Sequence, residues 1–106
     1  MKGIVVIVAY RPKPGKAEET LQLIRNRVPT LRREGLVTDR ESTMVRARDG
    51  TIIEVSEWKS REAIDAAHHN PNVLTMWEKF FAVCVCVPLK TVPETEEMFA
   101  GFEPLN

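Results

Sequence analysis

Residues 4–10 read IVVIVAY and residues 82–87 read AVCVCV, and both runs are hydrophobic at every position. Successive side chains of a strand point to opposite faces of its sheet. A strand without alternating polar positions is therefore covered on both faces. A chain of 106 residues has too few helices to cover both faces of a sheet. We expect these two strands to bury their second face against another copy of the same chain.

The composition is that of one ordinary globular domain, which we expect to span residues 1–106 with a core over about residues 3–90. The 15 basic and 15 acidic residues cancel, so nothing indicates a nucleic-acid or membrane-surface partner. No apolar run approaches the roughly 18 residues that cross a bilayer, and no signal peptide precedes the first strand. The two cysteines then favour a cytoplasmic location.

The segment after the first strand is predicted to be a turn and a helix. Residues 11–16 contain two prolines and a glycine, which indicate a turn. From about Ala17 the apolar residues recur at helical spacing, and Gly35 is a typical helix stop. Pro29 removes a hydrogen bond inside this helix, so we expect a kink or a restart near Val28.

The remaining elements are predicted from the turn, capping and helix-breaking residues between them. Residues 37–48 suit a polar edge strand, and Asp49-Gly50 predicts a tight hairpin turn with positive φ at both positions. A strand returns over residues 51–58. Ser60 is a suitable N-cap for a second helix, and Asn70-Pro71 interrupts that helix before a second helical piece. The last strand is expected over about residues 82–89, and one or two helical turns over 93–99.

The order strand, helix, strand, strand, helix, strand is the ferredoxin-like βαββαβ plan. We therefore predict an α+β fold with a four-stranded antiparallel sheet and both helices on one face. The other face is left apolar and bare, as at a protein interface. Two such sheets packed face to face form a dimeric α+β barrel, so we expect a homodimer. The C-terminal segment, residues 91–106, is expected to dock on the dimer.

Three stretches resemble the antibiotic biosynthesis monooxygenase (ABM) superfamily. They are YRPKPGK at residues 10–16, EWKSREA at residues 57–63, and Asn70-Pro71 followed by Trp77 and Phe80. The resemblance covers roughly residues 3–90 and implies a dimeric α+β barrel. The superfamily includes cofactor-free quinone-forming monooxygenases, haem-degrading enzymes and small-molecule isomerases. Fold alone does not choose among these activities.

The resemblance to the haem-degrading branch fails at that branch's functional positions. That branch relies on an asparagine in the first strand, a tryptophan in the second helix and a later histidine. This chain has Ile7-Val8-Ala9 in the first region, Ala66 and Ala67 in the second, and Trp77-Glu78 in the third. Haem degradation is therefore disfavoured, and no cofactor is expected.

His68 and His69 are the two histidines of the chain. His68 lies four residues after the apolar Ile64, so we expect one of the two to face inward. Histidine is a suitable proton shuttle near neutral pH, which makes His68 the candidate catalytic base for removing a phenolic or carbon-bound proton. The alternative is a structural histidine at a helix end. Adjacent helical residues diverge, so the pair does not suit a metal site.

Aromatic side chains are the candidate ligand contacts. They would form the wall of a pocket between the sheet and the helices, which suits a flat phenolic ligand. The alternative is ordinary core, which the helical spacing of Trp77 and Phe81 favours. The candidate substrate-binding residues are Tyr10, Trp58, Trp77 and Phe80.

Glu54 and Glu57 lie on opposite faces of the strand over residues 51–58. Either is a candidate acid or base, since a buried carboxylate is paired or has a raised pKa. An ion pair with a neighbouring strand is the favoured interpretation. The expected partners are Arg40, Arg46 and Arg48.

The cysteines and the arginines of the first helix are expected to have structural and not functional roles. Cys84 and Cys86 share one strand face, where a disulfide is unfavourable and buried thiols pack as small hydrophobes. The first helix carries a set of basic residues that we expect to form a solvated outer face: Arg25, Arg27, Arg32 and Arg33.

The leading functional hypothesis is a small ABM-like oxidoreductase, a cofactor-independent monooxygenase of an aromatic or quinol-like molecule. Its mechanism would be removal of a proton by His68 and reaction of the electron-rich anion with oxygen in a dry pocket. The alternative is a non-catalytic small-molecule-binding or structural homodimer, which a pocket without an inward histidine would favour. RNA binding on the sheet is set aside because that mode needs exposed aromatic residues on the central strands.

Overall fold

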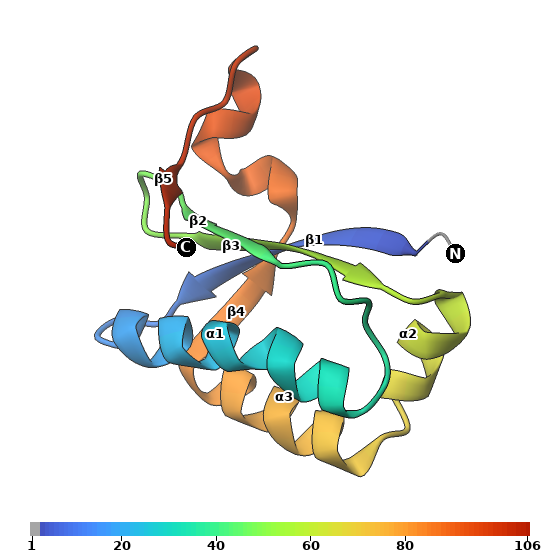
Figure 1. Ribbon diagram of the computed structural model, residues 1–106. Coiled ribbons are helices and arrows are strands. Elements are labelled where there is room, and N and C mark those ends of the chain that lie inside the picture. The colour runs from blue at the N-terminus through green and yellow to red at the C-terminus, as the bar shows by residue number, and fades with distance from the viewer. Residues whose placement is uncertain (1–2) are drawn as a thin grey trace.

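The computed structural model describes residues 3–106. This part of the chain forms a sheet, three α-helices and two short 3-10 helices (Figure 1). The elements in chain order are β1 Ile4–Pro12, α1 Ala17–Arg33, β2 Thr43–Arg46, β3 Ile52–Trp58, α2 Arg61–Ala67, α3 Pro71–Val83, β4 Cys84–Val87, η1 Leu89–Thr91, η2 Pro93–Glu96 and β5 Glu103–Pro104.

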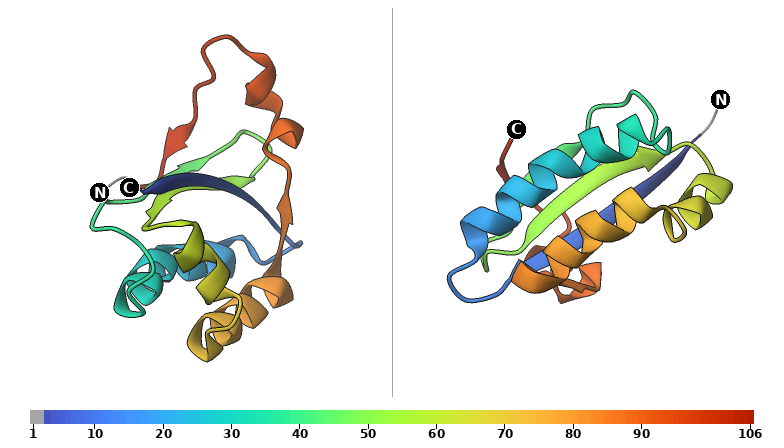
Figure 2. Two further views of the ribbon diagram at one scale, coloured as in Figure 1. Left: turned by 90° about the vertical axis from the view of Figure 1, so that its right-hand side faces the viewer. Right: turned by 90° about the horizontal axis from the view of Figure 1, so that it is seen from below.

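The sheet has the strand order β4-β1-β3-β2-β5, and all its pairs are antiparallel. Helices α1 and α3 lie on one face, and the segment after β4 rises on the other (Figure 2). The predicted α+β ferredoxin-like fold is therefore confirmed. The C-terminal strand β5, which the sequence did not predict, extends the sheet by pairing with β2.

Strand β1 is longer than predicted at its C-terminal end. Arg11 and Pro12 belong to the expected turn, yet they continue the strand and pair with Val85 and Cys84 of β4. The pairing with β3 stops at Tyr10. Pro12 therefore has a neighbouring strand, β4, on one side only. The missing N–H of a proline is tolerated on the open side, because no ladder hydrogen bond is lost there.

Helix α1 runs from Ala17 to Arg33 without a restart, so the predicted restart near Val28 is wrong. Pro29 lies on the exposed side of the helix, as does Arg25 one turn earlier. Pro29 leaves the Arg25 carbonyl without its helical donor, and it does so on the exposed side of the helix. The interruption predicted at Pro29 is thus accommodated on the solvent side.

The β2–β3 hairpin also differs from the prediction. The Ala47 N–H donates to the Thr51 carbonyl at 2.8 Å, and the Gly50 N–H donates to the Ala47 carbonyl at 3.0 Å. Gly50 has φ +92°, whereas none of the described non-glycine residues has a positive φ. The loop therefore has three residues and ends in a left-handed glycine. The Asp49 carboxylate stabilises this wider loop by accepting the Thr51 N–H at 2.9 Å.

The predicted edge strand over residues 37–48 is reduced to the four residues of β2, with an isolated bridge from Val37 to Trp58. The cap predicted at Ser60 is present, and Asn70, where the sequence predicts only an interruption, caps the next helix. The Ser60 hydroxyl accepts the Ala63 N–H at 3.0 Å, and the Asn70 side chain caps α3 with Pro71 at its start. Helix α3 continues through Val83, which shortens the last apolar strand to β4.

Each face of the sheet has its own apolar cluster. The larger cluster lies between the sheet and the helices and includes Ile24 and Leu31 of α1, both 0 % exposed. On the opposite face, Val92 of the C-terminal segment packs near Ala9 and Ile53. That segment covers only part of the face, and the rest is open. The exposed apolar residues there are Val5 (54 %), Ile7 (49 %) and Val85 (52 %).

Candidate active site

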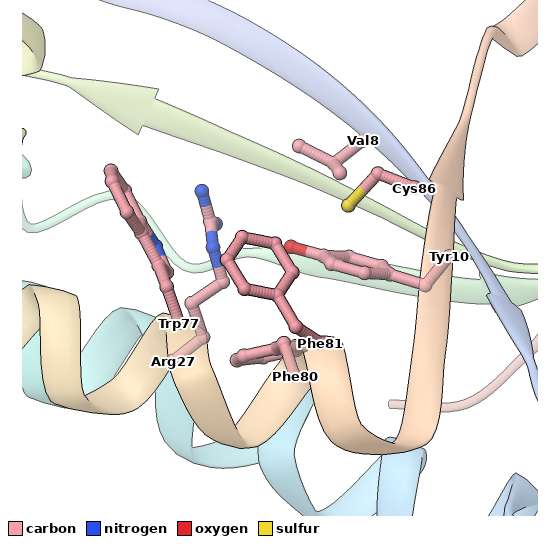
Figure 3. Close-up of a pocket in the computed structure, with 7 residues that line it drawn as sticks. All are labelled: Val8, Tyr10, Arg27, Trp77, Phe80, Phe81 and Cys86. Carbon is pink, nitrogen blue, oxygen red and sulfur yellow. The ribbon is translucent and has the colours of Figure 1, made fainter.

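A cavity of about 230 Å³ lies between the sheet and helix α3. Aromatic and aliphatic side chains form most of its wall, and four of the lining side chains carry polar atoms (Figure 3). These atoms belong to the Tyr10 hydroxyl, the Arg27 guanidinium, the Trp77 indole N–H and the Cys86 thiol. The full lining consists of Val8, Tyr10, Arg27, Trp77, Phe80, Phe81 and Cys86.

The strand register and the helix period place these side chains. Tyr10 of β1 pairs with Cys86 of β4, so both point to the helix face of the sheet. Helix α3 faces them with Trp77 and, three and four residues later, Phe80 and Phe81, which share one side of the helix. The Tyr10 and Phe80 rings stack at 5.3 Å between centroids. Phe81, 66 % exposed, forms the rim.

Arg27 of α1 is the buried cation of this site, with 5 % exposure. Its Nη1 donates to Glu54 Oε1 at 2.9 Å and to Ser56 Oγ at 3.3 Å, and its guanidinium lies 5.8 Å from the centre of the Trp58 ring. The prediction of a solvated face is right for Arg25, which is exposed, and wrong for Arg27.

Glu54 is completely buried, and its Oε2 has no hydrogen-bond partner within residues 3–106. Burial raises the pKa of Glu54, and the Arg27 charge opposes that rise. The predicted ion pair with a neighbouring strand is therefore wrong for Glu54, whose partner is Arg27 of α1. Glu57 does have a predicted partner, since Arg40 Nε lies 3.2 Å from Glu57 Oε1.

Tyr10 is 4 % exposed, and no protein group within residues 3–106 hydrogen-bonds to its hydroxyl. Burial raises the pKa of Tyr10, and this effect exceeds the lowering by Arg27. The hydroxyl therefore stays protonated and can donate. It points toward the side of the pocket where Arg27 stands (Figure 3).

Both histidines are exposed, so the expectation that one faces inward is wrong. Helix α2 ends at Ala67, which makes His68 the C-cap and turns its side chain outward. His68 Nδ1 lies 3.0 Å from the Ile64 carbonyl oxygen, and its ring meets Trp77 edge-on at 5.2 Å. His68 therefore borders a pocket residue without lining the pocket.

Three of the four predicted substrate contacts line the pocket, and the fourth does not. Tyr10, Trp77 and Phe80 line the pocket, whereas Trp58 is buried behind Arg27.

Cys84 and Cys86 are free thiols on one face, as predicted. Within residues 3–106 no group of three or more His, Cys, Asp or Glu side chains is placed to hold a metal ion. No helix in the described chain is both long and apolar enough to cross a membrane.

The family model of the antibiotic biosynthesis monooxygenases matches residues 3–79, more than half of the chain. The chain belongs to this family. The solved structure of SnoaB, described as a cofactor-independent oxygenase from Streptomyces nogalater, superposes with a TM-score of 0.67 at 15 % identity. The match covers 82 % of this chain and 88 % of SnoaB, and at that identity it shows a shared fold. Comparison with curated proteins finds no match.

Proposed function

We propose that this ABM-family protein is a cofactor-independent monooxygenase of a small aromatic or quinol-like molecule. The aromatic-walled pocket carries the proposal. An apolar cavity of about 150 Å³ takes up benzene, and this cavity of about 230 Å³ has room for a substituted ring. Stacked and edge-on contacts with its aromatic walls suit such a ring. The similarity to SnoaB, titled a cofactor-independent oxygenase, supports the same class of chemistry.

The substrate itself supplies the electrons in this reaction. Loss of a proton makes a hydroquinone ring electron-rich, and molecular oxygen then forms a bond to a ring carbon. When the O–O bond breaks, one oxygen atom stays in the hydroxyquinone product and the other leaves as water. The four electrons that reduce oxygen all come from the ring, so no external reductant takes part. The apolar walls keep water from the reactive anion.

Tyr10, Trp77 and Phe80 hold the ring in this proposal, and Trp58 supports Arg27 from behind. His68 is the proposed proton acceptor. Its Nδ1 is engaged by the Ile64 carbonyl, which leaves Nε2 to accept the proton. Contact with Trp77 places the imidazole beside the pocket wall.

Oxygen uptake with a panel of hydroquinones tests the proposed function. We expect uptake that persists with a metal chelator, and incorporation of one oxygen atom from ¹⁸O₂ into the product. H68A should lower the uptake, and the neighbouring exposed residue provides the matched control H69A. Unchanged uptake in H68A would remove His68 from the mechanism. Absence of uptake across the panel would remove the oxygenase proposal.

A non-catalytic binding protein is the second candidate function. The observation that favours it is the outward position of both histidines, which leaves the pocket without an imidazole in its lining. This candidate predicts that hydroquinones bind and quench Trp77 fluorescence while no oxygen is consumed.

We also propose that the protein works as a homodimer in the cytoplasm. Val5, Ile7 and Val85 leave an apolar strip uncovered on the face opposite the helices. The segment that carries Met98 (90 % exposed) and Phe99 (88 % exposed) rises on the same side of the sheet (Figures 1 and 2). A second copy would cover the strip and give this segment a surface on which to dock. The free thiols of Cys84 and Cys86 support a reducing compartment.

A further inference from the structure

We propose that the pocket binds its ligand as an anion: an aromatic molecule whose ionised hydroxyl oxygen is held by Arg27 and the Tyr10 hydroxyl. The inference rests on the proposed function in one respect, because it takes this pocket as the ligand site. It does not require that the ligand react with oxygen.

Arg27 has hydrogen-bond donors left for a ligand. A guanidinium carries five N–H donors, and both bonds that Arg27 makes within the described chain start from Nη1. Glu54 and Ser56 therefore hold one side of the group. The guanidinium stands in the pocket between Trp77 and Phe81 (Figure 3). Its remaining donors are thus available to an acceptor in the cavity.

Tyr10 offers a second donor. Its ring is fixed by stacking on Phe80, and its hydroxyl, which faces the pocket, has no protein partner within residues 3–106. An oxygen on the ligand would satisfy this hydroxyl and Arg27 together. Because burial raises the pKa of Tyr10, the hydroxyl stays a donor when an anion is bound.

The walls and the charge select the ligand class. A single buried cation surrounded by aromatic side chains suits one delocalised negative charge on a ring. A phosphate carries more charge than this lining can balance. Glu54 is the opposing charge, since its carboxylate neutralises Arg27 when the pocket is empty. It positions Arg27 and also limits how tightly an anion binds.

The experiment compares two coloured probes of the same shape, 4-nitrophenol and its methyl ether 4-nitroanisole. The affinity for the phenolate divided by the affinity for the ether isolates the effect of the ionised oxygen. Binding of the ether shows that a variant is folded with its pocket intact. In the wild type we expect tighter binding of the phenolate. Bound nitrophenol should also show the anion's absorbance at a pH where the free phenol is mostly neutral.

Four variants give distinct expectations for this ratio. R27Q should lower it about 10- to 100-fold, the usual effect of a hydrogen bond to a charged group. Y10F, which keeps the ring, should lower it by about 3- to 10-fold. E54Q should raise it, because the opposing charge is gone. R25Q is the matched control on the exposed side of α1 and should leave it unchanged.

A ratio near one in the wild type, or a ratio unaffected by R27Q while the ether still binds, would overturn the inference. If R27Q fails to bind the ether, Y10F and E54Q provide the test. The inference expects Y10F to lower the affinity ratio and E54Q to raise it, so a shift of both ratios in the same direction would overturn it. Tighter binding of 4-nitrobenzoate than of nitrophenolate would overturn the assignment to a hydroxyl oxygen. Selective phenolate binding without oxygen uptake would refute the proposed oxygenase and leave this inference standing.

Discussion

Arg27 Nη1 and Glu54 Oε1 lie 2.9 Å apart, and the two side chains are 6 % and 1 % exposed. The pair joins helix α1 to the central strand β3, and Trp58 lies against the guanidinium. A buried charge that loses its partner is strongly unfavourable, more so than the loss of an exposed ion pair. This contact therefore couples the stability of the domain to the shape of its pocket.

R27M should destabilise the protein by about 3–5 kcal/mol, because it leaves the Glu54 carboxylate buried without a partner. The double variant R27M/E54M removes both charges and should recover much of that loss. Urea denaturation followed by circular dichroism measures both free energies of unfolding. R25M is the control and should match the wild type. A double variant no more stable than R27M would show that the cost of R27M does not come from the unpaired carboxylate.

The proposed dimer predicts that a charge on the open sheet face produces monomers. I7E places a carboxylate in the centre of the apolar strip, where a partner sheet would desolvate it. Sedimentation at micromolar concentration should show a dimer for the wild type and a monomer of about 12.1 kDa for I7E. R25E, on the exposed side of α1, should remain dimeric. A monomeric wild type at that concentration would contradict the proposed dimer.

Much of the fold follows from local sequence signals. The non-alternating run at residues 4–10 marks a strand of the sheet interior, Ser60 caps α2 as expected, and Asn70-Pro71 separates α2 from α3 as expected. The errors occur where several local solutions are compatible with the same residues. Asp49-Gly50 fits a two-residue turn as well as the observed three-residue loop. Only the register of the flanking strands decides between them.

The site is harder to predict because tertiary contacts define it. The sequence predicts Tyr10, Trp77 and Phe80 as ligand contacts, and all three line the pocket. Its charge places Arg27 among the solvated arginines of the helix, although Arg27 follows Ile24 by three residues and so lies beside the buried stripe of α1. That spacing was the available signal. Glu54, two strands away from any exposed edge, needed a cation from outside the sheet, and no β-strand neighbour supplied one.

We expect the contacts of the Glu57 carboxylate to stabilise the protein less at acidic pH. The Thr38 hydroxyl at 2.8 Å, and then Arg40, hold the pKa of Glu57 below its ordinary value of 4.5. The folded state thus favours the carboxylate, so the stabilisation is present above pH 4.5 and disappears as the pH falls through the lowered pKa. Melting curves of wild type and E57Q should converge between neutral and low pH. T38V removes the main hydrogen bond to Glu57. In a T38V background, the difference in melting temperature that E57Q causes at neutral pH should therefore be smaller. A gap that stays constant with pH would exclude this origin.

The two thiols provide a chemical test of the pocket. Cys86 lines it and is exposed, whereas Cys84 is buried and its pKa is raised to about 11, mainly by burial. Burial also raises the pKa of Cys86 above its usual 9.0. Because the thiolate is the reactive form, iodoacetamide should label both slowly at neutral pH, and Cys86 first as the pH rises. Mass spectrometry of the wild type, C84S and C86S assigns each site. Saturating 4-nitroanisole should slow labelling of Cys86, since an occupied pocket covers its sulfur. Equal labelling rates with and without the probe would place the bound ring somewhere other than beside Cys86.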